Sequence, residues 1–173
     1  MRWVYITLLV VVGTAVLVTA IGALLPVGHV ASQEARVEAA PRTIWSLMTN
    51  PDAFPAWRKD VRRVERLPAH DGQETWAEET SSGRITFAVE RSESERLLVV
   101  RIADPDLPFG GSWTYELVPD GAATLVKITE RGEVYNPLFR FIARFVIGHH
   151  GTMTAYLEAL KKKAAAGEQR HGV

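Results

Sequence analysis

The C-terminal segment, residues 136–163, constrains the fold most strongly because it predicts one long amphipathic helix. Asn136 is a favourable N-cap, and Pro137 suits the first helical position, where its missing N–H costs nothing. Side chains at three- and four-residue steps form one broad face: Leu138, Phe141, Ile142, Phe145, His149, Thr152, Met153, Tyr156 and Leu160. Such a face needs a surface to cover, and we expect the preceding chain to supply it.

The chain before this segment predicts a strand, two short helices and then six strands in succession. Residues 29–39 alternate between apolar and polar side chains, which is typical of a half-buried strand. Residues 41–48 predict a short helix, and residues 50–57 a proline-broken turn or second short helix. The six further strands are expected at residues 61–67, 73–80, 84–91, 95–103, 112–118 and 123–131. Strands and helices segregated in this way indicate an α+β fold, with a curved antiparallel sheet of about seven strands around the last helix.

The N-terminal segment, residues 3–28, is uncharged and almost wholly apolar, and it is long enough to cross a bilayer core of about 30 Å. Three interpretations are open: a retained membrane anchor, a signal cleaved after Val18-Thr19-Ala20, or a buried core helix. The apolar run continues beyond Ala20 and only Arg2 precedes it, which favours retention. Arg2 also favours a cytoplasmic N-terminus, with the following domain outside the cytoplasm.

Composition limits the remaining classes of function. Acidic and basic residues number 20 each, which gives no support for a nucleic-acid partner. The chain has no cysteine, which excludes disulfides, thiolate metal sites and cysteine nucleophiles. We therefore predict an anchor at residues 1–28, a single domain at residues 29–163 and a disordered tail at residues 164–173. The sequence does not indicate an oligomeric state.

Residues 40–57, which read APRTIWSLMTNPDAFPAW, resemble the first helical region of the START-like superfamily. The chain is most similar to its polyketide cyclase/dehydrase (SRPBCC) group, over residues 30–163. The Ala40-Pro41 entry, Trp45 and Trp57 carry the resemblance, whereas Asn50 stands where many relatives have aspartate. The resemblance implies a helix-grip fold with a hydrophobic cavity between the sheet and the last helix, often holding a lipid, sterol or polyketide. The superfamily shares a fold more than a chemistry, so function must be argued from the site.

His149 is the strongly polar side chain at the centre of the apolar helical face. It is expected either to hydrogen-bond or protonate a ligand, or to be a core histidine satisfied by a neighbour. Aromatic residues of the strands would line the pocket or simply fill the core. The predicted ligand-binding residues are His149, Phe145, Met153, Phe141, Trp76, Trp113, Tyr115, Phe87 and Phe109. His149 and His150 diverge around a helix, and we find no histidine pair at metal-binding spacing, so we predict neither a metal nor a cofactor.

Two other segments are candidates for functional roles. The proline- and glycine-rich loop at residues 104–111 is expected either to gate the cavity or to be a tight structural connection. Glu130, Glu133 and Tyr135 either supply polar pocket groups or lie on the surface. A basic cluster predicts a solvated edge strand or a contact with anionic lipid; its members are Arg58, Lys59, Arg62, Arg63 and Arg66.

Three functions remain open at this point. The first is membrane-anchored binding of an apolar small molecule or lipid. The second is a cyclase- or dehydratase-like enzyme that uses His149 with a nearby carboxylate as acid and base. The third is a membrane accessory protein whose cavity is only a core. A filled cavity favours the first, two titratable groups in contact across the pocket favour the second, and a cavity too small for any ligand favours the third.

Overall fold

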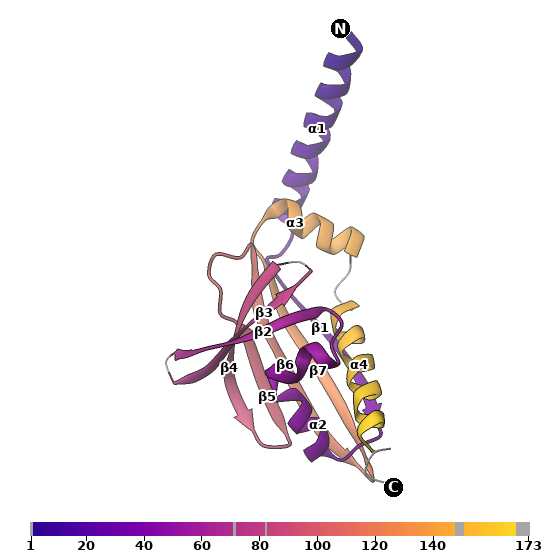
Figure 1. Cartoon of the computed structure of the whole chain (residues 1–173). Helices are drawn as coiled ribbons and strands as arrows, with labels where there is room; N and C mark the ends of the chain where they lie inside the picture. The colour runs from indigo at the N-terminus through magenta and orange to yellow at the C-terminus, as the bar shows by residue number, and fades with distance from the viewer. Residues whose placement is uncertain (1, 71, 82, 148–150, 169–173) are drawn as a thin grey trace.

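The computed structural model describes residues 2–70, 72–81, 83–147 and 151–168. Within them, a seven-stranded antiparallel sheet curls around a C-terminal helix, and a long N-terminal helix projects from one end (Figure 1). The helices are α1 (Arg2–Leu24), α2 (Pro41–Met48), the 3-10 helix η1 (Pro51–Ala56), α3 (Pro137–Ile142), the π-helical turn η2 (Ala143–Ile147) and α4 (Gly151–Glu168). The strands are β1 (Gly28–Val37), β2 (Val61–His70), β3 (Gln73–Thr80), β4 (Gly83–Glu93), β5 (Leu97–Ile102), β6 (Phe109–Asp120) and β7 (Ala123–Val134). The predicted helix-grip fold class is confirmed.

The sheet has the strand order β1-β7-β6-β5-β4-β3-β2, with all neighbours antiparallel. Consecutive strands from β2 to β7 pair directly, because short turns join them; Gly121 adopts a positive φ of 65° in the β6–β7 turn. β1 pairs with β7, so the first and last strands of the domain lie side by side. β2 lies at the opposite edge, where Pro68 is tolerated because an edge strand needs fewer backbone donors.

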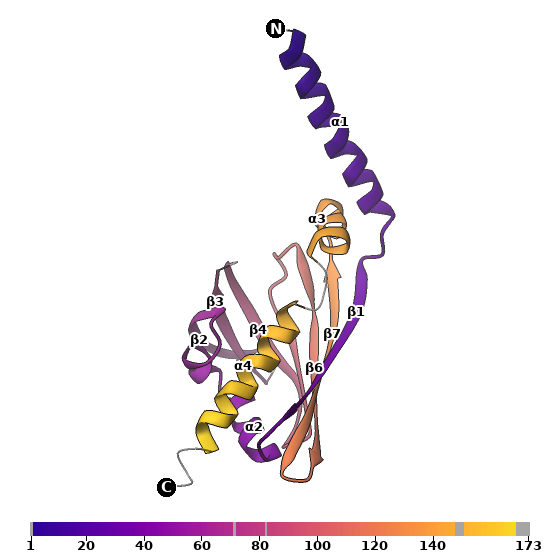
Figure 2. The same ribbon diagram turned by 90° about the vertical axis from the view of Figure 1, so that its right-hand side faces the viewer.

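The hydrophobic core lies between the concave face of the sheet and the helices α2 and α4, which Figure 2 shows on one side of the sheet. Ile44 of α2, Ile128 of β7 and Leu160 of α4 are almost completely buried there. Alternation along the strands sends one set of side chains into this core and the other to solvent. α4 therefore packs its apolar face into the core, as the amphipathic pattern of its residues predicts.

The prediction of one long C-terminal helix with a single buried face is wrong. The helical segment that begins at Pro137 becomes η2 after Ile142, and α4 runs in a different direction from α3 (Figure 1). Phe145, predicted at the centre of the buried face, is 60% exposed. α3 has a different packing partner from α4, because α3 packs on α1 whereas α4 packs on β1 and α2. α4 also continues to Glu168 and buries Ala164, beyond the expected end at Lys163.

α3 packs on the C-terminal end of α1, the end that leads into β1. Figure 1 shows α3 lying across this end. Gly22 is buried at this contact, and a Cβ there would collide with the carbonyl group of Pro137. The Arg140 guanidinium donates from Nη1 to the carbonyl of Leu25 at 2.8 Å. A glycine and a guanidinium thus hold α3 against the last turn of α1, which the periodicity of the C-terminal segment does not reveal.

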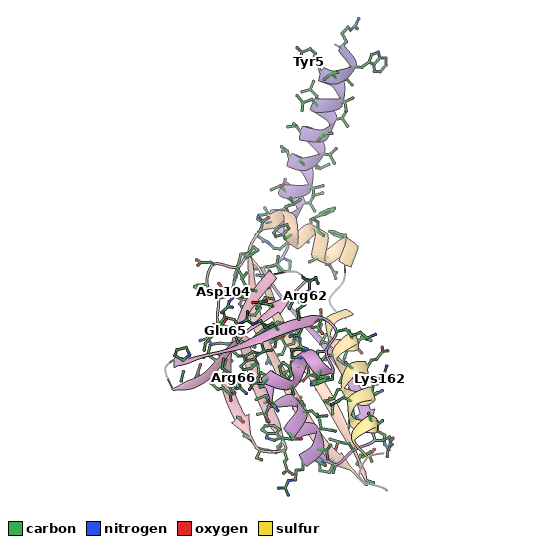
Figure 3. The ribbon with its side chains drawn as sticks, viewed as in Figure 1. Tyr5, Arg62, Glu65, Arg66, Asp104 and Lys162 are labelled. Atoms are coloured by element: carbon green, nitrogen blue, oxygen red, sulfur yellow. The ribbon has the colours of Figure 1, made fainter. Side chains whose placement is uncertain are left out.

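α1 is the one helix in the described part of the chain that is long and apolar enough to cross a membrane, with a mean hydropathy of 2.5. Its side chains project outward on all sides, as Figure 3 shows from Tyr5 down to the domain. None of its most apolar window is buried in the protein. The interpretation as a buried core helix is therefore wrong, whereas both a retained span and a signal sequence fit these properties.

Candidate functional site

A cavity of about 520 Å³ lies between the concave face of the sheet and α4. Its size falls in the range of ordinary small-molecule pockets, about 300–1,000 Å³. Thr152, Met153 and Tyr156 of α4 form one wall, and strands β3 to β7 form the other. Of the predicted ligand-binding residues, those that line this cavity are Met153, Trp76, Trp113, Tyr115, Phe87 and Phe109.

Two other predicted residues, Phe141 and Phe145, do not line the cavity. Phe141 and Phe145 belong to α3 and η2, where their rings contact each other with centroids 4.9 Å apart, away from the cavity wall. The spacing of Phe141 and Phe145 continues the apolar pattern of α4, but α3 packs on α1 and not inside the curved sheet. His149 lies outside the described residues.

Aromatic rings line the sheet side of the cavity. Trp76 of β3 and Phe87 of β4 are direct partners in the strand register, and their rings stack with centroids 5.8 Å apart. Phe87 in turn meets Trp113 of β6 edge-on at 6.0 Å. Because side chains that share one face of a sheet sit opposite one another, three separate strands build one continuous aromatic wall.

A buried ion pair closes one side of the cavity. Arg58 follows η1, and its guanidinium meets both carboxylate oxygens of Glu78 on β3, at 3.1 and 3.0 Å. Trp76, two residues before Glu78 on the same strand face, donates its indole N–H to that carboxylate at 3.0 Å. The Arg58 guanidinium also lies over the rings of Phe54 and Tyr156. The Arg58 and Glu78 side chains are only 13% and 3% exposed, so this pair is part of the interior.

The charge state of Arg58 is fixed by its neighbours. Burial lowers the pKa of the Arg58 guanidinium, but the nearby carboxylates of Glu78 and Asp60 outweigh burial and hold that pKa above its ordinary value. The site therefore contains a permanent cation matched to a buried carboxylate. Of the predicted basic cluster, Arg58 is in the interior, whereas Arg63 and Arg66 form exposed ion pairs along the edge strand β2, whose Arg62, Glu65 and Arg66 are labelled in Figure 3.

Two tyrosines bring hydroxyl groups to the cavity. Tyr115 of β6 and Tyr156 of α4 both line it, with ring centroids 5.4 Å apart. No hydrogen bond within the described residues satisfies either phenol. Burial is the main cause that raises the pKa of both hydroxyl groups above the ordinary value of 10.0, so both stay neutral. Each can donate one hydrogen bond to a ligand in the cavity.

These raised pKa values predict that stability falls under alkaline conditions. Below about pH 10 the phenols are protonated in both the folded and unfolded chain and add no pH dependence. Above it, the unfolded chain loses protons that the folded chain retains, so the free energy of unfolding decreases. Denaturant titrations across this range should show a smaller decrease for Tyr156→Phe than for the unaltered chain. Parallel decreases in the two proteins would contradict the assignment.

A second polar cluster lies where β1, β6 and β7 adjoin. Glu130 accepts a hydrogen bond from the Trp113 indole N–H at 3.0 Å, across the β6–β7 register, and its other oxygen is 3.1 Å from His29 Nε2. His29 stands opposite Gly132 in the β1–β7 register, and a Cβ at that glycine would collide with the imidazole ring. Gly132 thus leaves the space in which a histidine and a carboxylate meet at the cavity.

Sequence reasoning missed most of these polar groups. The sequence places His29 at the start of a strand and Arg58 in the basic cluster, with no signal that either lines a pocket. It leaves Glu130 open as a pocket or a surface residue, and the structure places that side chain, 15% exposed, at the cavity wall. The signal that could have found His29 and Glu130 is pairing of the first and last strands, which brings distant residues together. Among the described residues, no group of three His, Cys, Asp or Glu is arranged to hold a metal.

The fold and this cavity can be compared with known proteins. The family model for polyketide cyclase/dehydrase and lipid transport matches residues 29–165, most of the chain. The chain belongs to this family. The match covers the whole helix-grip domain and leaves out α1. No curated protein matches the chain closely enough in sequence to stand as a relative.

Several solved structures have a similar fold at low sequence identity. A START superfamily protein from Mycobacterium smegmatis is 19% identical, with a TM-score of 0.62 over 80% of this chain and 98% of that one. The Zhui aromatase/cyclase from Streptomyces sp. R1128 is 13% identical, with a TM-score of 0.67 over 84% and 98%. Norcoclaurine synthase from Thalictrum flavum, in complex with dopamine and hydroxybenzaldehyde, is 18% identical, with a TM-score of 0.62 over 81% and 88%. These similarities establish the fold, while the chemistry of the cavity must be argued from its own residues.

Proposed function

We propose that this protein binds an apolar small molecule or lipid in the cavity between the sheet and α4, while α1 anchors it in a membrane. The observation that carries the proposal is the cavity itself, about 520 Å³ in volume and walled by Trp76, Phe87 and Trp113. Ligand pockets typically combine such an apolar wall with a few polar groups that fix orientation. Tyr115 and Tyr156 offer hydroxyl donors for that purpose.

The polar groups favour a ligand that is neutral at its polar end. Arg58 is already paired with Glu78, so no guanidinium among the described residues that line the cavity lacks a carboxylate partner. Glu130 adds a further acidic group beside His29. Bringing an anionic ligand into an enclosed apolar site without an opposite charge is strongly unfavourable. Sterol-like, polyketide-like or phenolic molecules fit this balance better than free fatty acids.

A cavity-filling substitution tests the binding proposal. Val100 of β5 lines the cavity and is 6% exposed, so Val100→Trp should fill the space and exclude the ligand. Purified full-length protein would be photolabelled with adamantyl diazirine, a neutral apolar probe, and the labelled peptides mapped by mass spectrometry. We expect label on β6 in the unaltered protein and none on β6 in Val100→Trp, while labelling of the lipid-facing segments, α1 among them, is the same in both.

The matched control is Val118→Trp, at an exposed valine on the distal half of β6. It adds the same side chain outside the cavity, so labelling of β6 should persist. Equal β6 labelling in Val100→Trp and in this control would show that the probe does not enter the cavity, and the binding proposal would fail.

The anchor is tested separately. If α1 spans the bilayer, full-length protein should stay in the membrane fraction after an alkaline wash, which removes proteins held only by surface charge. Its N-terminal peptides, including residues near Tyr5, should still be present in the mature chain. Release into the soluble fraction, or a mature chain that begins beyond Ala20, would identify α1 as a cleaved signal instead.

A second candidate function is acid/base catalysis, and the contact between His29 and Glu130 favours it. An imidazole 3.1 Å from a carboxylate at a cavity wall can exchange protons with a bound carbonyl or hydroxyl group. The hypothesis for His149 stays a separate prediction, because that residue lies outside the described part of the chain. Glu130→Gln should then stop the chemical conversion of a co-purifying compound without releasing it. Conversion at an unchanged rate would exclude this role.

A further inference from the structure

Apolar side chains of α3 and η2 are exposed beside the C-terminal end of α1. Leu138, Phe139 and Phe145 are 38%, 46% and 60% exposed. No residue of α3 is buried. α3 packs against the C-terminal end of α1 and touches β7, and these contacts leave the three side chains exposed. Large apolar groups gathered at one end of a domain commonly mark an interaction surface.

The position of α3 relative to α1 is constrained. Only residues 25–27 separate the end of α1 from the start of β1, which is too short a linker to move the domain far from the helix. The close approach of Gly22 to Pro137 and the hydrogen bond from Arg140 to Leu25 fasten α3 to the last turn of α1. The 23 residues of α1 extend about 34 Å, which matches a bilayer core of about 30 Å. A span of this length leaves its last turn at the edge of the hydrocarbon.

We propose that α3 and η2 lie in the interface of the bilayer that α1 crosses, with Leu138, Phe139 and Phe145 inserted among the lipids. This inference rests on the membrane anchoring proposed above. Helices that lie in the interface bury an apolar face at the boundary of headgroups and acyl chains, and arginine suits the phosphate layer. The exposed Arg144 is positioned for that contact. α3 runs across the C-terminal end of α1 instead of continuing along it, as an interfacial helix beside a span must (Figure 1).

The arrangement determines which end of the cavity faces the lipid. His29 at the start of β1, Phe109 at the start of β6 and Val134 at the end of β7 all line the cavity. β1 begins where α1 ends, and β7 leads directly into α3, so these residues lie at the membrane end of the domain. With α3 in the interface, this end of the cavity faces the bilayer surface, where apolar molecules concentrate.

The absence of cysteine from the chain allows a direct test by single-site labelling. Phe139→Cys, Phe145→Cys, Leu9→Cys and Val118→Cys would each be labelled with an environment-sensitive nitrobenzoxadiazole dye. Leu9 reports on the middle of α1, and Val118, an exposed valine on β6 at the far end of the sheet, is the control. The full-length proteins would be reconstituted into phosphatidylcholine vesicles, with or without lipids spin-labelled at shallow or deep acyl positions.

We expect the labels at positions 139 and 145 to be quenched several-fold more by shallow spin labels than the label at position 118. The label at position 9 should be quenched most by deep spin labels. Quenching at position 9 with positions 139 and 145 indistinguishable from 118 would overturn the interfacial placement and leave the anchor intact. Blue-shifted but unquenched labels at 139 and 145 would show that protein covers them, such as a second copy of the chain. No quenching at position 9 would overturn the anchor and this inference together.

Discussion

Replacing Glu78 by alanine should lower the free energy of unfolding by about 3–5 kcal/mol, the usual cost of leaving one member of a buried ion pair without its partner. Glu78 is 3% exposed and Arg58 13% exposed, so the guanidinium left behind cannot regain full hydration and keeps only the solvent-exposed Asp60 as an ion-pair partner. The same change removes the acceptor of the Trp76 indole N–H. The effect is measured by chemical denaturation of the full-length protein in detergent.

The matched control is Glu65→Ala. Glu65 also pairs with an arginine, Arg84, at 2.7 Å, but both side chains are 45% exposed. Surface pairs of this kind contribute little because water replaces the lost partner. A double replacement, Arg58→Met with Glu78→Leu, should recover much of the stability lost in Glu78→Ala, since it leaves no buried charge unpaired and the Asp60 carboxylate is 55% exposed. Equal losses at Glu78 and Glu65 would show that the Arg58–Glu78 pair is not buried in solution.

Leu160→Ala should cost about 2–5 kcal/mol, the range for truncating a fully buried leucine. Leu160 is 0% exposed on the face of α4 that meets the sheet. Lys161, the next residue, lies on the solvent side of the same helix, as does the labelled Lys162 in Figure 3. Lys161→Ala changes a side chain of the same helix without touching the core, so its effect should be small. Similar effects at the two positions would mean that α4 does not pack on the sheet through this face.

The sheet and the short helices could be predicted from sequence because their signals are local. Alternation gives each strand, and Pro41 with the apolar positions of residues 41–48 gives α2. The alternation also selects Trp76, Phe87 and Trp113 as neighbours on one face. The resemblance to the family then indicates that this face of the sheet packs against a C-terminal helix.

The C-terminal region could not be predicted because two different partners shape it. The spacing of Phe141 and Phe145 continues the pattern of Met153 and Tyr156, so periodicity alone joins them into one helix. Packing of Pro137 on Gly22 is a contact between residues far apart in sequence, and it directs α3 toward α1. An apolar helical face indicates that a helix packs against a partner, but it does not identify which element that partner is.

The polar part of the cavity depends on strand pairing between the ends of the domain. His29 and Glu130 are 101 residues apart in sequence and meet because β1 pairs with β7. Arg58 falls in a run of basic residues, and only the tertiary fold separates this one from its exposed neighbours. Residue type and spacing therefore identify the aromatic wall better than they identify the polar groups.

Native mass spectrometry of the full-length protein, released from detergent micelles, tests the central claim most directly. A protein that binds an apolar molecule in this cavity should carry an added mass of one ligand per chain. The added mass should disappear in Val100→Trp, which fills the cavity, and persist in Val118→Trp, at an exposed site on the same sheet. A spectrum with only the bare mass of the chain, or the same added mass in Val100→Trp, would contradict the account.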